Sequence, residues 1–170
     1  MHGFMPRRLA LALFTVGILS HGVALAEGDV SVALSAYRVT MSQGKEAYVP
    51  AEQARPGEVI EYRATYKNTG KQAVKDLMAT LPIPQGLEYL PKTAQPVQLL
   101  ASVDGTNYEA VPLVRRVKGA DGRIVVRDVP LSEYRWLRWP MGTLAARAES
   151  QVRARMRVTP LEPVATNSTR

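Results

Sequence analysis

Histidine and cysteine are nearly absent from this chain. It has no cysteine, and both histidines, His2 and His21, lie within the first 26 residues. From residue 27 onward, neither a Ser-His-Asp nor a Cys-His mechanism can be assembled, and the usual ligands of zinc, copper and haem are missing. We therefore expect no cofactor and no enzymatic activity. Two carboxylates can still form the catalytic pair of a small hydrolase, which we keep as an alternative.

Long apolar runs are also scarce, since only residues 9–19 form one. These 11 residues are too few to span a bilayer, which takes about 20. The run follows Arg7 and Arg8 and precedes Ala24-Leu25-Ala26, the pattern of a secretory signal peptide cleaved before Glu27. The sequence thus predicts a signal peptide at residues 1–26 and export to the periplasm or the extracellular space. It predicts no transmembrane segment in the mature chain.

The charge of the exported chain is only moderately unbalanced. Without Arg7 and Arg8, it carries 20 Lys+Arg against 15 Asp+Glu. This excess favours anionic partners, but it is far from that of a dedicated nucleic-acid-binding protein, so we expect no nucleic-acid partner. Residues 27–170 are enough for one domain with its own core.

Alternation of apolar and polar side chains predicts strands throughout the chain. Residues 59–70 alternate clearly, and residues 151–159 do so with Val152, Ala154, Met156 and Val158 facing inward. Further strands are expected at residues 31–41, 73–84 and 123–129, with a hairpin at 98–111 turning at Asp104-Gly105. A helix is the alternative for residues 144–156, but their period of two favours a strand. About seven to eight strands at residues 27–160 predict an all-β, antiparallel β-sandwich, with a flexible C-terminal tail at 161–170.

Several motifs occur in the order that is typical of a known family, and through them the chain resembles domain of unknown function eleven. They are Pro56-Gly57, Asn68-Thr69-Gly70, residues 84–86, Trp139, residues 144–146 and residues 152–158. The family is an immunoglobulin-like module of bacterial envelope and surface proteins, and the resemblance covers residues 50–160. It implies an immunoglobulin-like, extracytoplasmic, non-enzymatic module. The sequence departs from the family pattern at Arg147, where glycine is usual, and in having a single copy.

The segment at residues 134–144 contains both tryptophans, interleaved with arginines. Because Trp136 and Trp139 are three apart, a strand places them on opposite faces. We expect Leu137, Trp139, Met141 and Leu144 to face inward, and Tyr134, Trp136 and Arg138 to face outward. If the last two strands pair, Arg153, Arg155 and Arg157 extend that outward face. This predicts a binding face for a glycan or an anionic lipid head group. The alternative is that the arginines keep an exposed strand soluble and Trp136 lies flat under their stems.

The sequence leads to one main hypothesis about function. We expect an exported, non-catalytic immunoglobulin-like module that binds or scaffolds in the bacterial cell envelope. Its partner would be an envelope protein or an anionic envelope component. The binder of glycans or anionic lipid head groups and the carboxylate-dependent hydrolase are the two alternatives.

Overall fold

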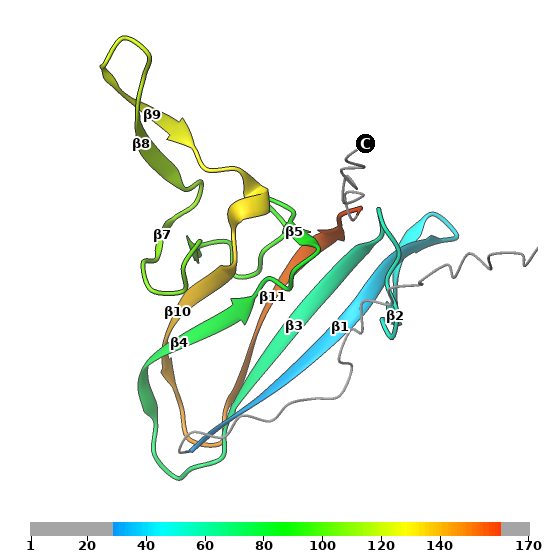
Figure 1. The fold of residues 1–170 in the computed structure, drawn as a ribbon. Coiled ribbons are helices and arrows are strands. Elements are labelled where there is room, and N and C mark those ends of the chain that lie inside the picture. Colours follow the sequence, from blue (N-terminus) through cyan, green and yellow to red (C-terminus); the bar gives the residue numbers. More distant parts are fainter. Residues whose placement is uncertain (1–28, 161–170) are drawn as a thin grey trace, which may run out of the picture.

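The computed structural model describes residues 29–160, so the predicted signal peptide at 1–26 and tail at 161–170 lie outside the described residues. The described chain is all-β with one short helical turn (Figure 1). Its elements are β1 Val30–Ser42, β2 Lys45–Pro50, β3 Val59–Asn68, β4 Val74–Pro82, β5 Leu87–Tyr89, β6 Leu100–Ser102, β7 Glu109–Ala110, β8 Val114–Lys118, β9 Ile124–Asp128, the 3-10 turn η1 Leu131–Glu133, β10 Trp136–Leu144 and β11 Glu149–Val158.

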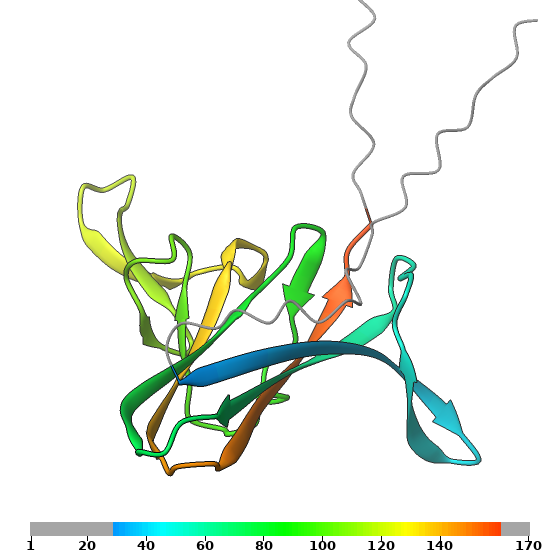
Figure 2. The ribbon, with the colours of Figure 1, turned by 90° about the horizontal axis from the view of Figure 1, so that it is seen from below.

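The strands form two larger antiparallel sheets and one separate hairpin. One sheet has the order β2-β1-β3-β11-β5, the other β4-β10-β6-β7, and β8 pairs only with β9. The prediction of an all-β, antiparallel fold is confirmed. The eleven strands exceed the predicted seven to eight because strands such as β5, β7 and β8 are short and lack a clear alternation. Figures 1 and 2 show β4 and β10 on one side of the molecule and β1, β3 and β11 on the other.

The core lies between the two larger sheets and follows the alternation of their strands. Strand β11 buries every second residue from Val152 to Val158, as predicted, and β3 does so from Ile60 to Tyr66, with Glu61 of its outer face buried in addition. Trp139 of β10 is fully buried, and its indole Nε1 donates a hydrogen bond to the Pro96 carbonyl at 2.8 Å. Leu137 and Leu144 are buried beside it, and Met141 packs partly buried against the same core. The prediction of an inward Trp139 is therefore confirmed.

Two of the turns that carry the chain from one sheet to the other lie between β3 and β4 and between β10 and β11. The buried Asn68 side chain ties them together, because its Nδ2 donates to the Gln72 and Leu144 carbonyls at 2.7 and 3.1 Å. Its Oδ1 also accepts the Gly70 N–H at 2.9 Å. In the second turn Arg147 has φ of 63°, a backbone conformation that glycine favours.

The prediction that the last two strands pair is wrong. Strand β10 pairs with β4 and β6, whereas β11 pairs with β3 and β5. The cause is the turn at residues 145–148, which passes between the sheets instead of reversing within one. Alternation reveals which side chains share a face of a strand, but it does not reveal which sheet contains the strand.

Candidate functional site

The structure divides five of the six residues of the predicted binding face between two sheets and places the sixth, Tyr134, outside both. Trp136 and Arg138 lie on β10, and the three arginines lie on β11 of the other sheet. Tyr134 precedes β10 and does not face outward at all. The six side chains therefore do not form one surface, and a binding role for them stays a prediction.

Tyr134 corrects the sequence-based assignment most clearly, because only 1% of it is exposed. Its hydroxyl accepts the Leu113 N–H at 2.7 Å, and its ring stacks on Tyr89 with centroids 6.5 Å apart. The physical reason is the 3-10 turn η1, which ends at Glu133. The alternation of β10 begins only at Trp136, so it cannot be extended back to residue 134.

On β10, both remaining members of the predicted face have partners from nearby loops. The Arg138 guanidinium lies over the Tyr108 ring, 3.4 Å from its centroid, and its Nε donates to Thr80 Oγ1 at 3.3 Å. Trp136 is half-buried against the turn at Gly105, where an added Cβ would lie 2.8 Å from the indole Nε1. Trp136 therefore packs against this turn, not under arginine stems.

On β11, the arginines face outward as predicted, but Arg153 and Arg155 are paired with carboxylates. Arg155 donates two hydrogen bonds to Glu46 at 2.7 and 2.6 Å and one to Glu61 at 3.0 Å. Arg153 lies 3.7 Å from the same Glu61 carboxylate, which is only 2% exposed. Arg157 is the exposed member of the three. The sequence did not indicate Glu46 and Glu61 as partners, because they come from strands about a hundred residues away.

Arg63 of β3 completes this network on the outer face of the sheet. Its guanidinium lies 4.6 Å from the ring centroids of both Tyr37 and Tyr48, and its Nε donates to Glu61 at 2.7 Å. Hydrogen bonds from Arg155, and then from Tyr48, lower the pKa of Glu46 to about 2. We call the set Tyr37, Glu46, Tyr48, Glu61, Arg63, Arg153 and Arg155 the arginine network. It joins β2 to β3 and β11, so its first role is to fasten the β1–β2 hairpin.

The largest group of exposed apolar side chains lies on the β8–β9 hairpin, although Val97 and Met41 outside it are individually more exposed, at 72% and 69%. Figure 1 shows this hairpin projecting away from the two sheets. Ile124 and Val126 are 64% and 62% exposed, and Val114 is 46% exposed. Sequence analysis predicted the β9 strand but not its exposure. The run Ile124-Val125-Val126 could have revealed it. This run lies between two arginines, and no polar residue interrupts it to mark an outward face.

The same hairpin is basic. Five Lys+Arg and two Asp+Glu occur between residues 114 and 128. Two of its arginines have carboxylate partners, Arg115 on Glu133 at 2.7 Å and Arg123 on Asp121 at 3.7 Å. The other cations of the hairpin, Arg116, Lys118 and Arg127, belong to none of the ion pairs of the described residues. In the arginine network, by contrast, every arginine has a carboxylate partner.

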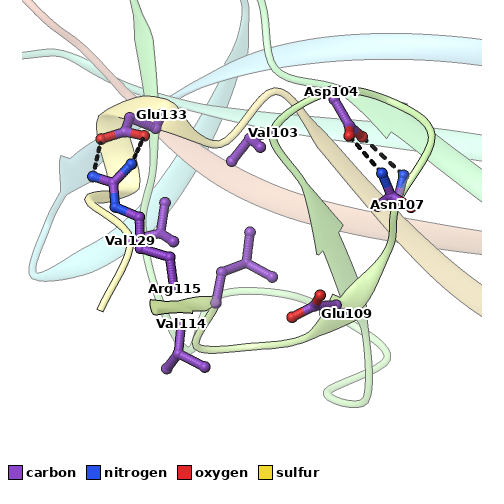
Figure 3. A pocket seen from close by; sticks show the side chains of 9 residues that line it. Val103, Asp104, Asn107, Glu109, Val114, Arg115, Val129 and Glu133 are labelled. Carbon is purple, nitrogen blue, oxygen red and sulfur yellow. Dashed lines mark hydrogen bonds and ion pairs between the residues drawn. The ribbon is translucent and has the colours of Figure 1, made fainter. Parts of the chain in front are cut away.

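A small cavity of about 160 Å³ lies at the base of the hairpin (Figure 3). Val103 and Val129 contribute to its apolar lining, and the bidentate Arg115–Glu133 pair closes one side. The cavity is smaller than the roughly 300–1,000 Å³ of typical small-molecule sites. On the opposite side, Asp104 accepts hydrogen bonds from the Thr106 and Asn107 N–H groups at 2.8 Å. These internal bonds fix the loop at residues 104–107, which contributes Asp104 and Asn107 to the lining.

The carboxylates offer little support for hydrolysis. Among the carboxyl groups of residues 29–160, three have a shifted pKa, and in all three the pKa is lowered. Hydrogen bonds from Arg155 lower the pKa of Glu46, and the backbone N–H groups of Asn107 and Thr106 lower the pKa of Asp104. Hydrogen bonds from Arg115 lower the pKa of Glu133. A glycosidase needs the opposite, a general acid with a raised pKa. Within residues 29–160, no three acidic side chains lie close enough together to hold a metal ion.

Comparison with known proteins adds no relative. No protein-family model, no curated protein and no solved structure matches this chain. No helix among residues 29–160 is both long enough and apolar enough to cross a membrane.

Proposed function

We propose that this chain is an exported, non-catalytic immunoglobulin-like module that binds an anionic component of the bacterial cell envelope. We further propose that the β8–β9 hairpin is its binding element. The leader pattern at residues 1–26 supports export, and the order of motifs in residues 50–160 supports the family. The two antiparallel sheets around the Trp139 core are compatible with an immunoglobulin-like scaffold.

One observation carries this proposal: the hairpin exposes apolar side chains that neither sheet uses. Strands β8 and β9 pair only with each other, so the hairpin adds no strand to either sheet of the sandwich. A contiguous exposed apolar patch with polar neighbours commonly marks an interaction site. Here Ile124 and Val126 provide the apolar part, and Arg116 and Lys118 lie opposite them on β8.

Charge determines the kind of partner that fits. The unpaired cations of the hairpin favour an anionic surface, and exposed charges contribute less as salt is added. Binding through the hairpin should therefore weaken between about 50 and 500 mM salt. The arginine network is a weaker candidate, because each of its three arginines already pairs with Glu46 or Glu61.

Shortening the hairpin tests the proposal. Residues 115–127 would be replaced by Asn-Gly, which forms a tight reversal between Val114 and Asp128. Purified residues 27–170, with and without this change, would be sedimented with isolated envelopes and separately with peptidoglycan across a salt series. We expect the parent chain to sediment at low salt and the shortened chain to stay in solution with an unchanged thermal midpoint. Equal sedimentation of the two chains would contradict the proposal.

A further inference from the structure

We infer that the β8–β9 hairpin lies in the interface of a phospholipid bilayer that contains anionic lipids. This inference rests on the proposed function and names the partner of the same hairpin. It follows from the arrangement of side chains on the two strands, from their exposure and from their charge.

The register of the hairpin separates its side chains into two faces. Residues directly opposite each other in an antiparallel pair share a face. Arg116 lies opposite Val126, and Lys118 lies opposite Ile124. Val114, opposite Asp128, belongs to the same face. Asp128, an exposed acid, lies at the sandwich end of this face. We call its apolar and basic members, Val114, Arg116, Lys118, Ile124 and Val126, the apolar–basic face.

This face combines two features that an interface requires. Branched apolar side chains stand on β9, and long basic side chains stand beside them on β8. In an interface the apolar groups can enter the boundary of the acyl chains while lysine and arginine extend toward the lipid phosphates. Arg116 and Lys118 can do so because no described carboxylate pairs with them.

The exposure of apolar side chains on the hairpin favours a lipid bilayer over a protein surface as its partner. Val125 belongs to the other face of the hairpin and is itself 37% exposed, so apolar groups are accessible on both faces. A protein partner that lies on one face leaves the other in water, whereas a bilayer interface can surround both. The flanking charges also act against an added strand, because Arg115, Arg116 and Lys118 occupy three of the five positions of β8.

The tip and the base of the hairpin suggest its orientation. The tip contains Asp121, whose carboxylate pairs with Arg123 and accepts its N–H at 3.1 Å. Because this polar tip would resist entry into an apolar medium, we place the hairpin along the membrane surface. At the base, the Arg115–Glu133 pair and the Tyr134 hydroxyl bonded to Leu113 hold the hairpin in a defined direction.

Vesicle flotation with purified residues 27–170 tests the inference. Vesicles of phosphatidylglycerol and phosphatidylcholine would be compared with vesicles of phosphatidylcholine alone. We expect binding only to the anionic vesicles. Binding should fall at least tenfold with Ile124→Asp and Val126→Asp combined, and similarly with Arg116→Glu and Lys118→Glu combined. The control is the pair Lys71→Glu and Lys75→Glu, which changes the charge equally at exposed positions outside the hairpin and should retain binding.

The absence of cysteine permits a second, direct measurement. An environment-sensitive dye attached through Ile124→Cys should shift to the blue on anionic vesicles, whereas the same dye attached through Lys71→Cys should not. A dye at position 124 that stays in water while the protein binds the vesicles would overturn insertion. If the variant with Ile124→Asp and Val126→Asp still binds the anionic vesicles, insertion is likewise overturned, because the protein would then bind the vesicles through its charges alone.

The two proposals fail in different ways. If hairpin-dependent sedimentation with envelopes persists but anionic vesicles do not bind, the bilayer inference is wrong and the proposed function stands with another anionic partner. If shortening the hairpin leaves envelope sedimentation unchanged, both proposals are wrong.

Discussion

Strand β11 and the β8–β9 hairpin both place arginines among valines, yet their guanidinium groups have different surroundings. On β11, Arg155 bonds to Glu46, Glu61 and Tyr48, and it is a central member of the arginine network. On the hairpin, Arg116 and Lys118 have no carboxylate partner among the described residues. The first set of charges holds strands together, and the second set is available to another molecule.

An arginine-rich pattern therefore does not by itself indicate binding. Both regions combine basic and apolar residues, so composition cannot distinguish them. The fold distinguishes them, because it brings acids from β2 and β3 to β11 and brings only Glu133 to the base of the hairpin. Substitutions in the two regions should therefore affect different properties, stability in one and binding in the other.

The largest effect on stability is expected from Arg155→Ala. The change removes three hydrogen bonds to carboxylates and weakens the compensation of the buried Glu61 charge, so we expect a loss of about 2–3 kcal/mol in the free energy of unfolding. Urea denaturation measures this loss. Arg155→Met is the control, because it keeps most of the aliphatic stem but not the charge. A change below about 0.5 kcal/mol in both variants would show that the network contributes little.

A smaller effect is expected from Tyr134→Phe, at the point where the hairpin joins the sandwich. The variant keeps the stacked ring but leaves the Leu113 N–H without its acceptor, which should cost about 1–2 kcal/mol. Urea denaturation measures the cost, and hydrogen exchange of the Leu113 amide should accelerate at the same time. Tyr89→Phe serves as a control on the other ring of the stacked pair. An unchanged exchange rate at Leu113 would contradict this role for the hydroxyl.

Acid should weaken the arginine network in a predictable range. Hydrogen bonds from Arg155 lower the pKa of Glu46 from its usual 4.5 to about 2 in the folded protein. Because the folded pKa lies below the unfolded one, the contribution of Glu46 is complete above about pH 4.5 and is lost as the pH falls toward 2. Unfolding in urea at several pH values should show a steeper loss for the parent chain than for Glu46→Gln. Parallel curves would contradict the pairing.

The smallest effect on stability is expected from Arg116→Ala on the hairpin. Its side chain is exposed and unpaired, so the free energy of unfolding should change by no more than about 0.5 kcal/mol. Thermal or urea denaturation alongside Arg155→Ala gives the comparison directly. A loss as large as that of Arg155→Ala would mean that the hairpin cations are structural too.

Much of the sandwich follows from local patterns in the sequence. The alternation of apolar residues predicts the inward faces of β3 and β11, and the spacing of Trp136 and Trp139 predicts which tryptophan is buried. The hairpin turn at Asp104-Gly105 is also predicted, and β6 and β7 flank it as a pair. These features depend on residues close together in the chain, which is why the sequence indicates them.

The features that were missed depend on contacts between distant segments. The separation of β10 from β11 depends on the path of the turn at residues 145–148. The burial of Tyr134 depends on the 3-10 turn before β10, which ends the alternation there. The neutralisation of Arg155 depends on Glu46, and these two residues are more than a hundred positions apart. None of these contacts has a signature in a single strand.

The most direct test of the account compares equal losses of charge in the two regions. Arg116→Ser with Lys118→Ser removes two cations from the hairpin, and Arg153→Ser with Arg157→Ser removes two from β11. Both variants would be sedimented with isolated envelopes at low salt, after circular dichroism has confirmed that they are folded. The account predicts that the hairpin variant stays in solution and that the β11 variant sediments like the parent chain. The reverse result would place binding on the β11 face and contradict the account.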